Sequence, residues 1–253
     1  MTTVFTELRR VVEDGGRAVV LTVIAGPELG AKLLVREDGS TAGDGPEELA
    51  ALVPEALRRG RSHVIEHDGA TIFADVYGPP PRLLVYGAID TAEALCRAAS
   101  LLGWRTIVAD ARARFATRER IPSADELLVA WPEEAIDQVQ PDLGTAIVVL
   151  THDDKFDLPM LTAALASDAF YVGALGSRRN QERRRGLLRE GGIEEADLDR
   201  ISGPCGLDLG AESPAETALS MLAEILATRA GRSGGPLKDA PHRIHAEPLA
   251  AKK

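Results

Sequence analysis

The chain has 253 residues, a formal net charge of −10 and an isoelectric point near 5.1. So acidic a chain lacks the basic surface that displaces counterions from nucleic acid or anionic lipid, which argues against both as partners. No apolar run reaches the roughly 18 residues of a membrane span, no signal pattern opens the chain, and its two cysteines form no C-x-x-C pair. We therefore expect a cytoplasmic two-domain protein without disulfides or a metal site, whose partners are small molecules and proteins.

Residues 1–78 predict a small N-terminal α+β domain. Apolar spacing and turn residues indicate, in chain order, a helix over 6–14, strands over 18–24 and 32–36, a helix over 46–59, and a hairpin over 64–76. The hairpin is expected to turn at Asp68-Gly69, which is a common two-residue turn sequence. Gly78-Pro-Pro-Pro81 is a stiff break in the chain, so it predicts a domain boundary.

Residues 82–230 alternate short apolar strands with helices, which predicts a C-terminal α/β domain, a Rossmann-like parallel sheet with helices on both faces. We expect strands over 83–86, 106–109, 127–130, 145–150 and 170–175, and helices over 90–102, 132–140, 158–166, 177–190 and 213–229. The last helix has the clearest start, because Ser213 and Glu216 form a capping box around Pro214. Residues 231–253 lack any apolar period and are predicted to be a flexible tail.

The first loop of this domain matches the dinucleotide motif G-x-G-x-x-G/A only in part. Gly87 and Ala92 fit its ends, but Ile89 replaces the central glycine with a side chain that takes the space of a phosphate. We also expect Asp90 to cap the following helix and to repel an anion. Gly87 and Ala88 stay candidate ligand contacts.

Asp110 lies 23 residues after Gly87, at the end of the second expected strand. An acid at that place hydrogen-bonds a ribose in dinucleotide-binding folds. The plainer interpretation is a residue that only terminates the strand, and the sequence leaves both open.

A polar run, Thr151-His-Asp-Asp154 with Asp157, leaves the most apolar strand at the edge where open α/β sheets bind ligands. His152 and Asp153 are therefore candidate ligand contacts, with a solvated polar loop as the alternative. Asp153, Asp154 and Asp157 are also the only compact acids that suit magnesium.

The segment from Gly173 to Arg179 is the most informative of these loops. Gly173 and Gly176 flank a strand end, and Ser177 and Arg178 open a helix whose positive end favours an anion. We predict that these four residues contact a phosphate-bearing ligand. The later arginines of that helix, 183–185 and 189, are expected to form a solvated face. Cys96 and Cys205 are expected to be buried core residues.

Five motifs coincide in order and spacing over residues 82–229: Tyr86-Gly-Ala88, Ile107-Val-Ala-Asp-Ala-Arg112, Leu150-Thr-His-Asp153, Tyr171-Val-Gly-Ala-Leu-Gly-Ser-Arg-Arg179, and Pro204-Cys-Gly-Leu-Asp-Leu-Gly210 with Ser213-Pro-Ala-Glu216. Together they resemble the Rossmann domain of the XdhC/CoxI family. Residues 25–43 are similar to the family's N-terminal domain, more loosely.

The resemblance implies a maturation factor that binds molybdenum cofactor (molybdopterin), guards its sulfurated form and hands it to an apoenzyme of the xanthine dehydrogenase or CO dehydrogenase type. It implies a molybdenum hydroxylase apoenzyme and a sulfur-transfer protein as partners. The chain departs from the family twice. Gly43-Asp-Gly-Pro-Glu-Glu48 stands where the family has Gly-Gly-Cys, and Gly87-Ala-Ile-Asp90 where it has Gly-Ala-Gly-His.

The leading hypothesis is thus a non-catalytic accessory protein that binds molybdenum cofactor, or a nucleotide, at the carboxyl edge of the sheet. One alternative is an enzyme, either an NAD(P)-dependent oxidoreductase or a cofactor nucleotidyltransferase. Another is a degenerate interaction module without a ligand. The apolar helix over 215–226 is expected either to cover a sheet edge or to form a homodimer seam.

Overall fold

The computed structural model describes residues 3–240, which belong to two compact units. One unit is residues 80–232, and the other joins the chain up to Pro79 with the segment that begins at Ser233. That segment contains one short 3-10 helix, η2 (Leu237–Asp239), and the rest of the expected tail, 241–253, lies outside the described residues.

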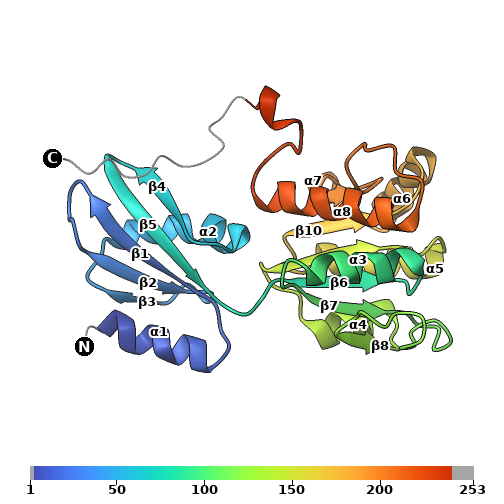
Figure 1. The fold of residues 1–253 in the computed structure, drawn as a ribbon, viewed down its shortest axis with the longest axis horizontal. Helices are drawn as coiled ribbons and strands as arrows, with labels where there is room; N and C mark the ends of the chain where they lie inside the picture. Colours follow the sequence, from blue (N-terminus) through green and yellow to red (C-terminus); the bar gives the residue numbers. More distant parts are fainter. Residues whose placement is uncertain (1–2, 241–253) are drawn as a thin grey trace. The chain divides into compact units, whose positions relative to one another are not determined.

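The first unit contains an antiparallel sheet with helices packed on it, and Figure 1 shows its elements up to β5 in blue and cyan. The strand order is β3-β2-β1-β5-β4. The elements are α1 (Thr3–Glu13), β1 (Ala18–Ala25), β2 (Lys32–Arg36), β3 (Thr41–Gly43), η1 (Glu47–Leu52), α2 (Val53–Arg59), β4 (His63–His67) and β5 (Ala70–Tyr77). Val4 and Val11 of α1 pack against Ala18, Val20 and Leu34 of the sheet.

The single helix expected over 46–59 is in fact two pieces, a 3-10 turn followed by α2. Pro54 lies at the start of α2 and has no N–H to donate to the preceding turn, so the helix restarts there. Strand β3 was not expected, because three half-exposed residues show no clear alternation.

The second unit is a six-stranded sheet, and all its paired strands are parallel. Its strands are β6 (Arg82–Tyr86), β7 (Arg105–Ala109), β8 (Glu126–Leu128), β9 (Thr145–Val149), β10 (Tyr171–Ala174) and β11 (Ile201–Ser202). They lie in the order β8-β7-β6-β9-β10-β11. This is the doubly wound order of dinucleotide-binding folds, and the winding direction changes between β6 and β9.

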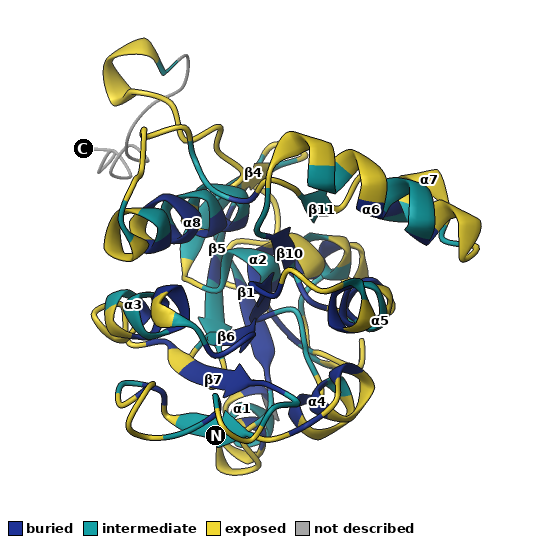
Figure 2. Cartoon of the chain, turned by 90° about the vertical axis from the view of Figure 1, so that its right-hand side faces the viewer, coloured by how far each residue is buried: buried dark blue, intermediate teal, exposed yellow. Residues whose placement is uncertain are grey.

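Helices cover both faces of this sheet, as expected, because alternate strand residues are apolar on each side. Figure 2 shows α3 and α8 on one face and α4, α5 and α6 on the other. The helices are α3 (Asp90–Ser100), α4 (Pro132–Val139), α5 (Asp154–Leu165), α6 (Arg178–Glu190), α7 (Glu195–Leu198) and α8 (Pro214–Arg229). Helix α8 packs on the sheet beside α3, through Ala218, Met221 and Ile225, and so covers a face rather than an edge.

Helix α5 was expected to begin at residue 158 but begins at Asp154. Asp153 caps it by accepting a hydrogen bond from the Lys155 amide at 3.0 Å, so the polar run belongs to the helix start. Helix α7 and strand β11 are too short to show a period and were not expected. No described helix is both long and apolar enough to cross a membrane.

Candidate functional site at the carboxyl edge of the parallel sheet

The register brings the expected site residues to one edge of the sheet. Tyr86 lies level with Ala109 on one side and with Val149 on the other. The residues that follow these three strand ends therefore lie side by side, at the edge where open α/β sheets bind ligands. Gly87, Asp110 and Leu150 are those residues.

Gly87, which follows β6, permits a close approach to the backbone that follows β9. Its φ is +112°, and a Cβ there would lie 3.0 Å from the Thr151 side chain and 3.1 Å from the Thr151 amide. Its own amide donates to Ala109 O at 2.8 Å. Glycine is thus required at this position for backbone geometry and packing.

The Asp110 carboxylate is buried and hydrogen-bonded to protein donors. It accepts from the Ala88 amide at 3.0 Å, from the Arg112 amide at 2.9 Å, and from the Arg112 guanidinium at 2.8 and 2.9 Å. Burial raises the pKa of Asp110, but these hydrogen bonds outweigh it, and the pKa lies below its usual value. The carboxylate is thus an ionised anchor that ties the first loop to the end of β7.

The expected capping of α3 by Asp90 is wrong. The N-cap residue is Ile89, no side chain caps the helix, and the Asp90 side chain is 87% exposed. The Ile89 side chain instead packs on the apolar core between the sheet and helices α3 and α8. Asp90 follows it as the first residue of α3.

The run after β9 divides into three different roles. His152 is exposed, and Asp153 caps α5. Asp154 forms an ion pair with Arg183 of α6, whereas Asp157 is buried. Within residues 3–240, no three His, Cys, Asp or Glu side chains gather as metal ligands do. Asp153, Asp154 and Asp157 instead contact protein groups, namely the Lys155 amide, Arg183 and Arg184 respectively.

Asp157 belongs to a buried polar network that joins both central loops. Thr151 donates its hydroxyl to this carboxylate, and Arg184 Nη2 donates to it at 2.5 Å. Arg184 also donates to Leu175 O at 2.8 Å, so one guanidinium connects the ends of β9 and β10. Burial raises the pKa of Asp157, and the Thr151 and Arg184 hydrogen bonds oppose that rise.

The expected solvated face of later arginines is therefore partly wrong. Arg183, Arg185 and Arg189 do form exposed ion pairs, but Arg184 is only 2% exposed. The burial of Arg184 could have been predicted from the helical spacing, because Leu188 lies four residues later on the same face of α6.

Ser177 is the N-cap of α6, which begins at Arg178, one residue later than expected. Its hydroxyl accepts from the Asn180 amide at 3.3 Å, and Gly176 before it has a φ of +136°. Arg178 and Arg179 follow in the first turn, and neither has an ion pair within the described part of the chain. Two guanidiniums that have no carboxylate partner among the described residues thus lie at the positive end of the helix dipole.

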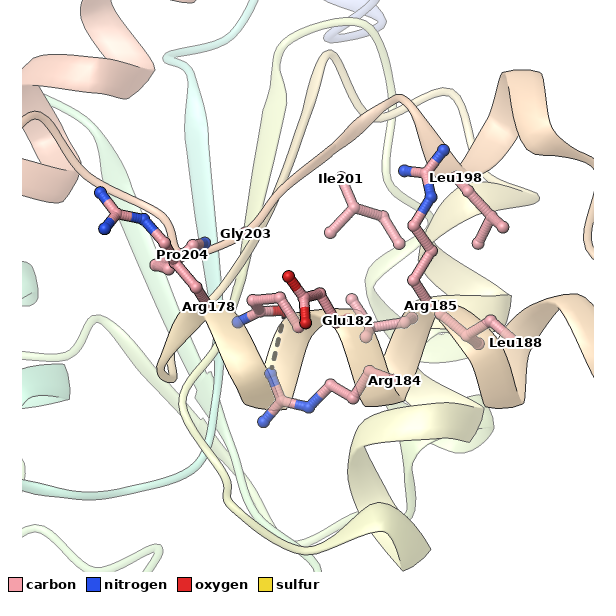
Figure 3. Close-up of a pocket in the computed structure, with 11 residues that line it drawn as sticks. Arg178, Glu182, Arg184, Arg185, Leu188, Leu198, Ile201, Gly203 and Pro204 are labelled. Carbon is pink, nitrogen blue, oxygen red and sulfur yellow. Dashed lines mark hydrogen bonds between the residues drawn. The ribbon is translucent and has the colours of Figure 1, made fainter.

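Arg178 also lines a pocket of about 320 Å³ between α6 and the chain after α7. Figure 3 shows Arg178 and Arg185 at opposite ends of this pocket, with Glu182 between them. Leu188, Leu198 and Ile201 supply its apolar wall. The Glu182 carboxylate thus separates the two guanidiniums within this pocket.

Gly173 serves packing rather than an open loop. A Cβ there would lie 2.7 Å from the Tyr171 ring and 3.0 Å from Cys205. Both cysteines are buried, as expected, and burial raises the pKa of each thiol to about 12. The site residues therefore fall into an inner group that builds the loops, Gly87, Asp110 and Gly173, and an outer group that faces solvent, His152 and Arg178.

Residues 83–225 match the family model described as the XdhC Rossmann domain, which is more than half of the chain. The chain belongs to the XdhC family. The match covers all six strands of the parallel sheet except the first residue of β6, and it includes every candidate site residue.

Curated relatives agree with this assignment. The chain is 30% identical to the uncharacterized protein YqeB of Escherichia coli over 94% of its length, and 33% identical to a probable subunit of xanthine dehydrogenase from Bacillus subtilis over 66%. It is 31% identical over 60% of its length to PaoD of Escherichia coli, a molybdenum cofactor insertion chaperone. The chain spans about half the length of these relatives, between 42% and 49%.

A crystal structure of a xanthine dehydrogenase from Bacillus halodurans has the same fold. It superimposes with a TM-score of 0.63 at 21% identity, over 89% of this chain and 67% of that one. At 21% identity, this similarity establishes a shared fold and nothing about function.

Proposed function

We propose that this XdhC-family protein is an accessory factor in the maturation of a molybdenum hydroxylase of the xanthine dehydrogenase or CO dehydrogenase type. It binds molybdenum cofactor, or a related phosphate-bearing ligand, and delivers it to the apoenzyme. Two relatives support this proposal, one named as part of a xanthine dehydrogenase and one as a cofactor insertion chaperone.

The observation that carries the proposal is the start of α6. Arg178 and Arg179 lie at a helix N-terminus without ion pairs to any described residue, in a chain whose net charge is −10. Their own position costs energy, because two cations face the positive end of the helix dipole. A bound phosphate removes that cost and accepts charge-assisted hydrogen bonds from the guanidiniums.

The donors present suit the phosphate end of a pterin cofactor. When bound, that cofactor supplies the molybdenum centre on which the target enzyme depends, and the chain supplies binding and orientation. Arg178 holds the phosphate, the Ser177 cap fixes the first turn, and the buried Arg184 keeps α6 in place against β9 and β10.

The geometry disfavours the NAD(P)-dependent alternative, because two groups of this edge that would contact a dinucleotide, the Ala88 amide and the Asp110 carboxylate, are already engaged. The Ala88 amide donates to Asp110, and the Asp110 carboxylate accepts four hydrogen bonds that leave little capacity for a ribose.

Coexpression with a molybdenum hydroxylase from the same source tests the proposal. We expect the wild-type chain to raise hydroxylase activity and Arg178→Ala to lose most of that effect. Arg189→Ala is the matched control, since Arg189 lies on the same helix and pairs with Glu195. Full hydroxylase activity without the chain would contradict the proposal.

A further inference from the structure

A second feature of the same edge lies beside the first loop and combines aromatic rings with cations. Trp131 precedes α4, Phe156 lies in the first turn of α5, and Arg112 follows β7. The Trp131 and Phe156 ring centroids lie 5.5 Å apart. The Arg112 guanidinium lies 5.5 Å from the Phe156 centroid and 4.3 Å from that of Phe115. The segments that follow β7, β8 and β9, three successive strands of the chain, thus contribute to one aromatic cluster.

The cluster has a rigid floor and an open surface. Phe156 is buried, and Arg112 is paired with the Asp110 carboxylate, so protein contacts position both. Trp131 is 44% exposed, and Val129, two residues before it, is 57% exposed. Leaving a large aromatic side chain half in water forgoes burial energy, and such exposed aromatic groups are common where a ligand completes the contact.

The charges around the cluster favour an anionic ligand. The Lys155 ammonium lies 4.8 Å above the Trp131 ring, and Arg114 lies 4.8 Å from the Phe115 centroid. Neither cation has an ion pair among residues 3–240. Arg120 approaches the same phenyl ring at 5.1 Å, and its nearest carboxylate, Asp90, is 3.9 Å away. Lys155 and Arg114 therefore add positive charge beside these rings, where Arg112 is already paired with Asp110 and Arg120 with Asp90.

We propose that Arg112, Phe115, Trp131, Lys155 and Phe156 form an aromatic platform that binds the planar heteroaromatic ring of an anionic ligand. The ring stacks on the exposed indole of Trp131, while Lys155 and Arg112 attract its negative groups. This inference deepens the proposed function, on which it rests, by assigning residues to the ring of the ligand. A pterin and a nucleobase share the required chemistry, a flat nitrogen heterocycle.

Tryptophan fluorescence tests this platform, because the chain has only two tryptophans. Trp104 is buried and packs against Phe170 at 6.3 Å in the core that contains α3 and α8. Trp104→Phe therefore leaves Trp131 as the reporter, and Trp131→Phe leaves Trp104. Each full-length variant is titrated with 6-carboxypterin and, separately, with cytidine 5′-monophosphate. Absorption of light by the probe affects both variants equally and cancels in their difference.

We expect saturable quenching in Trp104→Phe by at least one probe and none beyond the absorption effect in Trp131→Phe. Quenching by the pterin alone assigns the platform to a pterin ring, and quenching by the nucleotide alone assigns it to a nucleobase. Calorimetry of the quenching probe should show about tenfold weaker binding to Trp131→Ala, the usual scale of a lost stacking contact, and wild-type affinity in Trp104→Phe.

Two results would overturn the platform: no difference in quenching between the two Phe variants for either probe up to millimolar concentration, or unchanged affinity in Trp131→Ala. These outcomes can be told apart from a failure of the proposed function. Quenching at Trp131 together with failed hydroxylase activation would reject the maturation role and keep the platform, whereas activation without quenching would do the reverse.

Discussion

The arginines of α6 show how one residue type serves different purposes on one helix. Arg178 and Arg179 have no carboxylate partner among the described residues, and Arg183 pairs with Asp154 at the surface. Arg184 is buried and joins two strand ends through backbone and carboxylate acceptors. Burial, rather than charge, separates these roles, because an ion pair contributes little in water and breaking one in the core leaves a charge without compensation.

This difference predicts unequal losses of stability. Arg184→Ala should lower the free energy of unfolding by roughly 3 to 5 kcal/mol, since it leaves the Asp157 carboxylate buried without its partner. Arg183→Ala is the control and should leave stability nearly unchanged, because its pair with Asp154 is exposed. Urea unfolding measures both. Similar small losses in the two variants would mean that the buried network is dispensable.

Asp110 predicts a dependence of stability on pH. Its pKa is lower in the folded chain than in the unfolded one, so its stabilising effect is complete above the unfolded pKa of about 3.9 and is lost as pH falls through the folded value. Asp110→Asn should therefore be less stable than the wild type at pH 6. The difference should shrink below about pH 4, as chemical unfolding at each pH would reveal. A constant difference across that range would refute the ionised anchor.

At the scale of elements, strands and long helices were predictable, because their apolar residues repeat with a clear period. Strands β6 and β9 and helix α8 lie within a residue or so of their expected bounds. The start of α5 was not predictable in this way. Its first turn contains only polar and charged residues besides Phe156, and what begins the helix is the Asp153 cap rather than a repeat. The aromatic platform was missed for a related reason, since its members lie on separate elements.

Glycines in the second unit give an element-scale prediction. Gly87→Ala should destabilise by more than about 1 kcal/mol, because a positive φ and close contact with Thr151 both oppose a Cβ. Gly186→Ala is the matched control, since Gly186 lies inside α6 with nothing within 4 Å of its Cβ position. It should stabilise by roughly 0.5 to 1 kcal/mol. Thermal unfolding compares them, and a destabilised Gly186→Ala would show that helix propensity does not govern that site.

At the scale of the whole molecule, the sequence predicted an alternating α/β domain, but the edge could be assembled only once the strand order was known. Gly87, Asp110 and His152 follow strands that neighbour one another in the sheet, although they are up to 65 residues apart in the chain. Long-range pairing of this kind leaves no local period. The doubly wound order brings these loops together and gives the family's separate motifs one common location.

The boundary of the second unit leads to a prediction about truncation. The Arg232 amide donates to Ala227 O at 2.8 Å and closes the last turn of α8. A chain that ends after Arg232 keeps this contact and all the described core of the parallel sheet. Its thermal transition for this unit should match that of the full chain, as calorimetry would record. A clear fall in the transition temperature would show that residues after 232 support the sheet.

In the proposed function, the carboxyl edge of the sheet holds a phosphate-bearing ligand through Arg178. Native mass spectrometry of the chain, purified from cells that synthesise molybdenum cofactor, tests this claim most directly. We expect the wild type, Asp90→Ala and Arg189→Ala to retain a small molecule with the mass of a phosphorylated pterin, and Arg178→Ala to lose it. The lost charge-assisted hydrogen bond is worth about 1.5 to 3 kcal/mol. No retained molecule in the wild type, or full retention by Arg178→Ala, would contradict the account.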